Sequence, residues 1–256
     1  MRLLIDIGNT QVKYVFHLVH EKTLATTFTE VVALEHKTFQ QALTSKDFAS
    51  VSEVIVANVQ GNDILTAIET WAALNNIAFM QVHSQSQAFG VSSSYQKPDR
   101  LGVDRWIAMI ATHKLYPAQN VLIVDAGTAT TVDLLNTEGQ HIGGWIMPGL
   151  QTMFDGLMNN TQKIIAEPLQ AQSLAFGVDS SACVNYGIWA MTIGAIKEAV
   201  AQANKLITLD KIILSGGNAA QIAHIIDDDF GIVVEFMPEL IFHGLSSFYT
   251  DHRSDF

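Results

Sequence analysis

The sequence predicts an α/β fold of two similar halves, each built on a mixed β-sheet. Leu3–Thr10 near the start and Val121–Thr128 near the middle share one pattern: an apolar run, then Asp-x-Gly-(Asn/Thr), then a second run rich in β-forming residues. The two aspartates, Asp6 and Asp125, are 119 positions apart, close to half of the 256 residues. After each copy, segments typical of strands alternate with segments typical of helices, which indicates an α/β fold.

The first half continues with alternating elements. Strand, helix, strand, helix, strand and helix are expected in that order at Thr23–Thr29, Val32–Lys46, Val54–Ala57, Asp63–Asn75, Ala78–Val82 and Leu101–Tyr116. Pro117 lies at the end of the last helix. We therefore expect domains at 1–117 and 118–256, with the hinge near residues 117–120.

The second half follows the same plan. A strand is expected at His141–Met147, ending at Pro148-Gly149. Further strands are expected at Lys211–Leu214 and Ile232–Phe236, and helices at Leu150–Asn159, Ser181–Asn204, Ala219–Ile226 and from Pro238 onward.

Composition excludes several classes of protein. Hydrophobic residues make up 48% and charged residues only 15%, which excludes a disordered chain. The formal net charge of −11 argues against nucleic acid as a partner, because an acidic surface repels phosphate backbones. Cys183 is the single cysteine, so no intrachain disulfide can form, and its apolar helical surroundings indicate a packed thiol.

The start of the sequence predicts the location. Met1–Ile5 runs directly into Asp6, without an apolar stretch of signal-peptide length. No window reaches the roughly 18 uninterrupted apolar residues that a membrane span needs. We therefore expect a soluble cytoplasmic protein with no membrane partner.

The repeated turns are candidate phosphate sites. In Asp6–Thr10 a carboxylate at a strand end precedes a glycine, whose tight turn exposes backbone N–H groups, and Asn9 and Thr10 add side-chain donors. Such a group can hold phosphate oxygens while the carboxylate faces a hydrated Mg²⁺. An ordinary β-turn explains the first copy equally well. The second copy at Asp125–Thr128 favours two turns that clasp a polyphosphate from both sides of a cleft.

Other glycine-rich segments leave two interpretations open. The sequence has neither a P-loop nor a dinucleotide-binding motif. Gly143–Gly149 is either a structural strand-to-helix turn or part of the cleft wall. Ser215–Asn218 follows a strand and opens a helix, which suits either a nucleotide or a plain helix cap.

The segment Tyr95–Trp106 places an acidic residue next to a basic one. Pro98 and Gly102 shape a loop that leads to Asp104 and Arg105 at a helix start. An Asp beside an Arg stays ionised and can accept a proton from a hydroxyl group. A helix-terminal charge with a surface ion pair is the alternative.

Four motifs in order resemble one family. These are the Asp-x-Gly-Asn-Thr opening at Asp6, the Tyr-x-x-Pro-x-x-Leu-Gly-x-Asp-Arg segment from Tyr95, the Asp-Ala-Gly-Thr-Ala turn at Asp125 and the Gly-Gly-x-Ile-x-Pro-Gly stretch from Gly143. Together they resemble type III pantothenate kinase, of the acetate and sugar kinase/Hsp70/actin superfamily. The resemblance implies ribonuclease-H-like or actin-like halves with a cleft between them. It also implies phosphorylation of pantothenate by ATP with Mg²⁺, the first step of coenzyme A biosynthesis, activation by a monovalent cation (K⁺ or NH₄⁺), and a homodimer.

The resemblance also implies roles for individual residues. Asp104 would be the proton acceptor facing the primary hydroxyl of pantothenate, Asp125 would bind the monovalent cation, and Thr128 would contact ATP. Chemistry alone allows Mg²⁺ at Asp125 as well, because both cations prefer oxygen ligands. ATP phosphates would lie against Asp6, Ile7, Gly8, Asn9, Thr10, Gln11, Val12 and Lys13, and pantothenate would lie against Tyr95, Gly102, Val103, Asp104, Arg105 and Ser180.

Ser180 departs from the family pattern, which usually has Thr at this position. The hydroxyl is kept and a methyl group is lost, so we expect some loss of packing against the substrate. In the family this residue reaches the site across the dimer interface, which would place the substrate site near that interface.

Two other functions remain open. The same fold could phosphorylate another small hydroxylated acid or a sugar. A non-catalytic nucleotide-binding accessory or regulatory protein is the other alternative, although the intact Asp6, Asp104, Arg105 and Asp125 speak against it.

Overall fold

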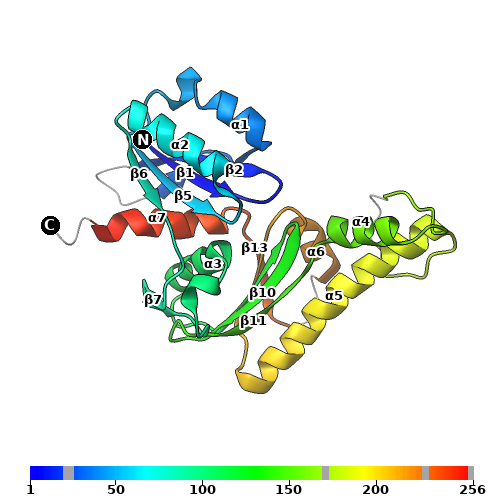
Figure 1. Cartoon of the computed structure of the whole chain (residues 1–256). Coiled ribbons are helices and arrows are strands. Elements are labelled where there is room, and N and C mark those ends of the chain that lie inside the picture. Colours follow the sequence, from blue (N-terminus) through cyan, green and yellow to red (C-terminus); the bar gives the residue numbers. More distant parts are fainter. Residues whose placement is uncertain (20–25, 169–172, 227–230, 253–256) are drawn as a thin grey trace. The chain divides into compact units, whose positions relative to one another are not determined.

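The computed structural model describes residues 1–19, 26–168, 173–226 and 231–252 (Figure 1). It divides into two compact units, one of Met1–Leu115 with Glu239–Phe256 and the other of Tyr116–Pro238. The expected division at residue 117 placed all of 118–256 in the second half. That assignment is wrong for the C-terminal helix, because α7 (Leu240–His252) packs against elements of the first unit.

The first unit is built on a mixed sheet with strand order β3-β2-β1-β5-β6, in which β4 also pairs with β2. The central strand β1 runs antiparallel to β2 and parallel to β5. The strands are β1 (Arg2–Ile7), β2 (Val12–Val19), β3 (Thr26–Phe28), β4 (Val32–Leu34), β5 (Glu53–Asn58) and β6 (Ala78–Gln81). The small hairpin β7 (Gln87–Ala88) and β8 (Val91–Ser92) is separate from this sheet.

The second unit repeats this plan, with strand order β11-β10-β9-β12-β13. Its central strand β9 is antiparallel to β10 and parallel to β12, as β1 is to β2 and β5. The prediction of an α/β fold with two mixed-sheet halves is therefore confirmed. The strands are β9 (Val121–Ala126), β10 (Ala129–Leu135), β11 (His141–Pro148), β12 (Lys211–Ser215) and β13 (Val233–Phe236).

Helices cover both faces of the first sheet (Figure 1). Phe39 of α1 (His36–Ala42) and Ile68 of α2 (Asn62–Leu74) share a core with Leu3 and Ile5 of β1. On the other face, α3 (Val103–Leu115) packs closely against α7. A Cβ on Gly244 would lie 2.3 Å from the carbonyl oxygen of Ile107, so this crossing requires glycine.

In the second unit, the long helix α5 (Ser180–Leu206) and α6 (Ala219–Ile226) pack on one sheet face. Ile193 and Ile196 of α5 share a core there with Leu122 and Val124 of β9. The N-terminal part of α5 pairs instead with α4 (Leu150–Asn160) through Phe154, Val184 and Ile188. Two short 3₁₀ turns lie in the first unit, η1 (Lys46–Phe48) and η2 (Pro98–Arg100).

Two predicted elements differ from the structure. The helix expected over Val32–Lys46 is wrong at its start, because Val32–Leu34 pairs with β2 as β4 and the helix begins only at His36. Of the strand expected at Thr23–Thr29, the observed β3 covers Thr26–Phe28, and residues 23–25 lie outside the described residues.

His17 lies buried on β2, among other basic groups. Burial is the main factor that lowers its pKa, to about 4, and the nearby charges of Arg2, Lys114 and His243 lower it further. The ring packs against Phe28, and no partner is found for Nδ1 within the described residues. The folded chain therefore holds His17 in its neutral form at neutral pH.

This burial predicts a loss of stability in mild acid. An unfolded histidine binds a proton near pH 6.5, whereas the folded His17 does so only near pH 4, so the unfolded chain binds more protons within this window. The free energy of unfolding should fall as the pH drops from 6.5 to about 4. Urea unfolding at several pH values measures the slope, which His17→Asn should reduce. The control His83→Asn, at an exposed position, should keep the wild-type slope. An unchanged slope in His17→Asn would refute the explanation.

Candidate functional site

The first Asp-x-Gly turn joins β1 to β2 at the carboxyl end of β1. Asp6 is the fifth of the six residues of β1, and its cross-strand neighbour is Lys13. The Gly8 N–H donates to the Gln11 carbonyl at 3.0 Å and closes the turn. A Cβ on Gly8 would lie only 3.2 Å from that oxygen, so the turn is tight. A carboxylate and an ammonium group thus lie on one face of the sheet beside the turn.

The eight residues predicted to bind ATP phosphates differ in exposure. Asn9, Thr10 and Gln11 are exposed at the tip of the turn, whereas the side chains of Ile7 and Val12 are buried. Ile7 and Val12 therefore offer a ligand only their backbone. Carboxylate, hydroxyl, amide and ammonium groups together form a donor set that fits phosphate oxygens with hydrated Mg²⁺.

The second turn, in the second unit, repeats this local structure with one residue fewer. Asp125 is again the fifth residue of a six-residue strand, and β9 has the same burial pattern as β1. The Gly127 N–H donates to the Ala129 carbonyl at 2.9 Å. The Thr128 carbonyl accepts two hydrogen bonds, from the Gly149 N–H at 3.0 Å and from the Thr152 hydroxyl at 2.7 Å.

Two other glycine motifs lie against this second turn. A Cβ on Gly216, where φ is +91°, would lie 2.4 Å from Asp125 Oδ1. A Cβ on Gly149 would lie 2.1 Å from the Gly127 carbonyl oxygen. Both glycines are therefore required for close approach to the turn. The structure brings three motifs of the second unit together, around Asp125, Gly149 and Gly216.

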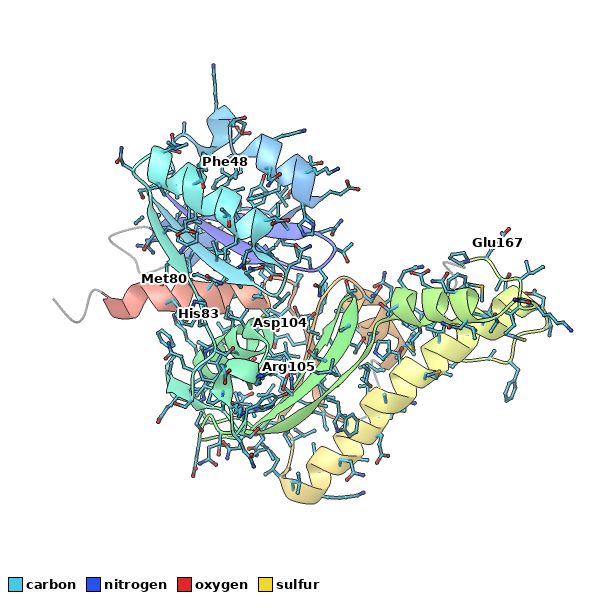
Figure 2. The ribbon with its side chains drawn as sticks, in the orientation of Figure 1. Phe48, Met80, His83, Asp104, Arg105 and Glu167 are labelled. Carbon is cyan, nitrogen blue, oxygen red and sulfur yellow. The ribbon has the colours of Figure 1, made fainter. Side chains whose placement is uncertain are left out.

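Asp104 lies in the first turn of α3, where Figure 2 labels it beside Arg105. Its Oδ1 accepts the N–H of Arg105 at 2.8 Å. A Cβ on Gly102 would lie 2.5 Å from the same Oδ1, so glycine at this position leaves room for the carboxylate. The hydrogen bond from the Arg105 N–H orients the Asp104 side chain.

Arg105 is almost fully buried and contacts Tyr95. Its Nη1 donates to the Tyr95 hydroxyl at 2.8 Å, and its guanidinium carbon lies 5.7 Å from the centre of the Tyr95 ring. A buried guanidinium needs hydrogen-bond acceptors, and Tyr95 supplies one. The structure therefore brings together three of the residues predicted to bind the acceptor substrate, Tyr95, Asp104 and Arg105.

A pocket of about 500 Å³ lies at the carboxyl ends of β5 and β6, within the first unit. Gly102 and Val103 line it, whereas Tyr95, Asp104 and Arg105 are not among its lining residues. Sequence reasoning missed its polar side chains, although the carboxyl ends of parallel strands are a common place for ligands. They belong to Asn58, His83, Ser84, Asp99 and Arg100. Because Asn58 is the register neighbour of Ile7, this pocket and the Asp6 turn share one edge of the sheet.

Ser180 is exposed at the start of α5, where the Asp179 carboxylate caps the helix by accepting the Ala182 N–H at 2.8 Å. The preceding loop exposes Phe176 and Val178 almost completely. Cys183 is also exposed, so the expectation of a packed thiol is wrong. The Cys183 thiol donates a hydrogen bond to the Gly177 carbonyl oxygen at 3.3 Å.

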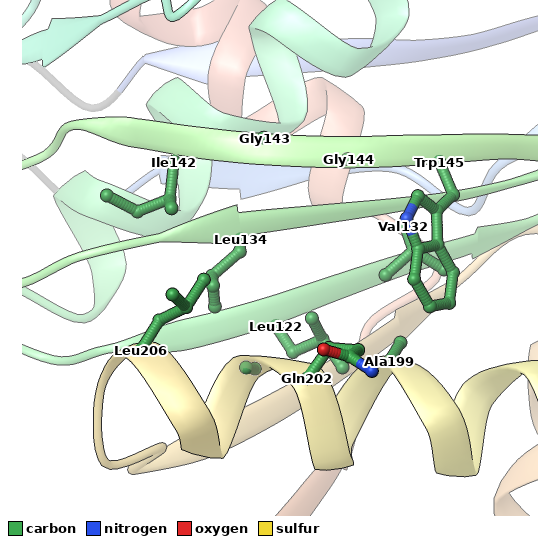
Figure 3. A pocket seen from close by; sticks show the side chains of 11 residues that line it. Leu122, Val132, Leu134, Ile142, Gly143, Gly144, Trp145, Ala199, Gln202 and Leu206 are labelled. Carbon is green, nitrogen blue, oxygen red and sulfur yellow. The ribbon is translucent and has the colours of Figure 1, made fainter.

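An apolar pocket of about 170 Å³ lies between α5 and strands β9 to β11 (Figure 3). Gly143 and Gly144 line it together with Trp145 and Leu206, and Gln202 supplies a polar side chain. Neither Asp125 nor Thr128 belongs to its lining. Part of the predicted Gly143–Gly149 segment therefore faces α5.

The described residues contain neither a candidate membrane span nor a candidate metal cluster. No helix among them is long and apolar enough to cross a membrane. No three His, Cys, Asp or Glu side chains gather there in a way that could hold a metal ion.

Comparison with known proteins identifies the family. A sequence model of type III pantothenate kinase matches residues 2–202. The chain belongs to the type III pantothenate kinase family. A type III pantothenate kinase of Colwellia psychrerythraea is 39% identical over 254 residues, with 97% of this chain and 100% of that protein covered. One of Pseudoalteromonas translucida is 33% identical over 250 residues, covering 97% and 96% respectively. This type III pantothenate kinase family member is therefore an enzyme of the kinase class.

Solved structures share the fold of this family member at low sequence identity. A structure titled as a conserved putative Baf family transcriptional activator from Campylobacter jejuni gives a TM-score of 0.61 at 19% identity, covering 98% of this chain and 99% of that one. A putative 2-dehydro-3-deoxygalactonokinase from Sinorhizobium meliloti gives 0.57 at 12% identity, covering 96% and 97%. At these identities the likeness is one of fold.

Proposed function

We propose that this enzyme transfers a phosphoryl group from ATP to pantothenate, giving 4'-phosphopantothenate in the first step of coenzyme A biosynthesis, with Asp104 as proton acceptor. The observation that carries the proposal is the orientation of Asp104. The Arg105 N–H and the space left by Gly102 direct its carboxylate, at the N-terminus of a helix. The family match supplies the substrate and the reaction class.

An ordinary aspartate carboxylate is a weak base, with a reference pKa of about 3.9. It suffices because phosphoryl transfer proceeds through a loose transition state, so the hydroxyl loses its proton late. Asp104 also orients the substrate hydroxyl for in-line attack before it accepts this proton. Arg105, held by Tyr95, would bind a neighbouring oxygen of pantothenate, and the backbone of Gly102 and Val103 would line the same place.

The ATP phosphates would lie against the Asp6–Lys13 turn, with a further contact from Thr128. The exposed Asn9 and Thr10 offer hydrogen-bond donors, Lys13 offers a positive charge, and the Asp6 carboxylate would face the Mg²⁺ bound with ATP. Bound with ATP, Mg²⁺ would neutralise negative charge on the phosphates as the phosphoryl group moves. The protein's own residues then supply position rather than new covalent chemistry.

Asp125 would bind a monovalent cation, K⁺ or NH₄⁺. Its carboxylate lies at a strand end against Gly216, beside the carbonyl groups of a tight turn. Oxygen ligands of this kind suit hard cations. A bound K⁺ would offset part of the charge on ATP.

The chain would act as a homodimer in which Ser180 completes the partner's acceptor site. The support is the apolar surface beside Ser180. Phe176, Val178 and Ile165 are exposed by 102%, 97% and 82%, respectively. Phe176 and Val178 stand two positions apart in the loop before Ser180, and neighbouring exposed apolar side chains are typical of interaction surfaces.

The proposal predicts ADP release that depends on pantothenate and is faster in K⁺ than in Na⁺ buffer. The assay uses MgATP with pantothenate, with a sugar or short hydroxy acid as control acceptor. Equal rates in both buffers would support the kinase activity and contradict the proposed K⁺ site at Asp125. Turnover of the control acceptor alone would move the function to another substrate, and ATP binding without any turnover would favour an accessory protein.

Asp104→Asn should lower kcat about 100-fold or more, the usual range for loss of a general base, while the KM for ATP changes little. Asparagine keeps an oxygen that can accept the Arg105 N–H, so the helix start is preserved. Asp63→Asn is the control, because Asp63 is also an acidic residue in the first turn of a helix, at an exposed position. Steady-state kinetics of both variants measure these constants. A wild-type kcat in Asp104→Asn would refute the role of Asp104 as proton acceptor.

Replacing Phe176 and Val178 by serine should weaken the dimer and lower activity in parallel, because Ser180 lies only two positions after Val178. Sedimentation velocity over a range of concentrations measures the association. Leu74→Ser is the control, since Leu74 is a 79% exposed apolar residue of the first unit. A double variant that dimerises as the wild type does would remove this surface from the interface.

A further inference from the structure

His36 contacts the phosphate turn although no motif includes it. Its Nε2 lies 3.0 Å from the carbonyl oxygen of Gly8, and the contact is partly buried. A carbonyl oxygen can only accept a hydrogen bond, so Nε2 carries the hydrogen and donates it. The ring is thereby attached to the backbone of the turn, 28 positions away in the sequence.

Strand β4 is what brings His36 to the turn. In the antiparallel pairing of β4 with β2, Leu34 is the register neighbour of Val12, the first residue after the turn. His36 follows two positions later as the first residue of α1. The β4–α1 connection therefore runs alongside the turn, and the hydrogen bond fastens the two together.

The hydrogen bond has a geometric consequence for the next peptide group. Gly8 C=O and Asn9 N–H belong to one planar peptide unit, and in a trans peptide they point in opposite directions. The structure has no cis peptide bond within the described residues. Holding the Gly8 oxygen toward His36 therefore turns the Asn9 N–H away from His36, while the Gly8 N–H is already bonded to Gln11 inside the turn.

We propose that His36 is a positioning residue of the phosphate turn: its Nε2–H fixes the Gly8–Asn9 peptide so that the Asn9 N–H faces the phosphate oxygens of the nucleotide. This inference rests on the proposed binding of ATP at Asp6–Lys13. Glycine makes the restraint useful, because a Gly8 peptide free of its partner can flip at little steric cost.

The test is a set of three substitutions with separate kinetics for the two substrates. His36→Ala removes the donor, His36→Phe keeps a ring without a donor, and His36→Gln keeps an N–H at similar reach. The first two should raise the KM for ATP about fivefold, the effect of one ordinary hydrogen bond, and change the KM for pantothenate and kcat less than twofold. His36→Gln should restore the wild-type KM for ATP.

Gln40→Ala, at an exposed position of the same helix, is the matched control and should match the wild type. A wild-type KM for ATP in both His36→Ala and His36→Phe would overturn the proposal. A Gln variant as impaired as Ala, or an equal rise in both KM values, would also overturn it, because only a general structural role predicts either result.

Direct binding of MgATP, measured by calorimetry on the same variants, separates this proposal from the proposed reaction. If the wild type shows no pantothenate-dependent turnover but His36→Ala still weakens MgATP binding about fivefold, the positioning role stands and the acceptor assignment fails. If turnover occurs and MgATP binding is the same in all variants, the reaction stands and the role of His36 fails.

Discussion

The candidate site depends on one constraint, the pairing of a fully buried central strand in each unit. β1 and β9 each have an antiparallel neighbour on one side and a parallel neighbour on the other. The apolar residues of both strands are buried. The aspartate at the fifth position is only partly buried, and it lies next to the turn that follows the strand. In each sheet, the pairing thus places a carboxylate and a tight turn at the carboxyl end of the central strand.

Two glycines allow neighbouring backbone to approach the carboxylates of Asp104 and Asp125 closely. At Gly102 and Gly216 an added Cβ would lie about as far from an aspartate oxygen as a covalent 1,3-neighbour, 2.5 Å and 2.4 Å. A non-glycine residue at either place would displace the carboxylate or the backbone that carries it. Glycine at positions 102 and 216 is therefore explained by the space that the Asp104 and Asp125 carboxylates occupy.

The sequence predicts what is periodic or local and misses what long-range packing decides. The repeat around Asp6 and Asp125 is visible because buried strands read as apolar runs. Val32–Leu34 looks helical in isolation, and only its pairing with β2 makes it a strand. Nothing local assigns α7 to the first unit, since its place follows from packing on α3. The same holds for His36, whose link to Gly8 arises from strand pairing rather than from any motif.

The two equivalent aspartates differ in their surroundings, which bears on the different roles proposed for them. The cross-strand neighbour of Asp6 is Lys13, whose ammonium group lies on the same face and supplies a positive charge. At Asp125 the corresponding neighbour is Thr131, which brings a neutral hydroxyl. The same local fold therefore carries a positive charge beside Asp6 and a neutral group beside Asp125. The positive charge of Lys13 fits the phosphate contact proposed for the Asp6 turn, and the neutral hydroxyl of Thr131 places no repelling charge beside the monovalent cation proposed at Asp125.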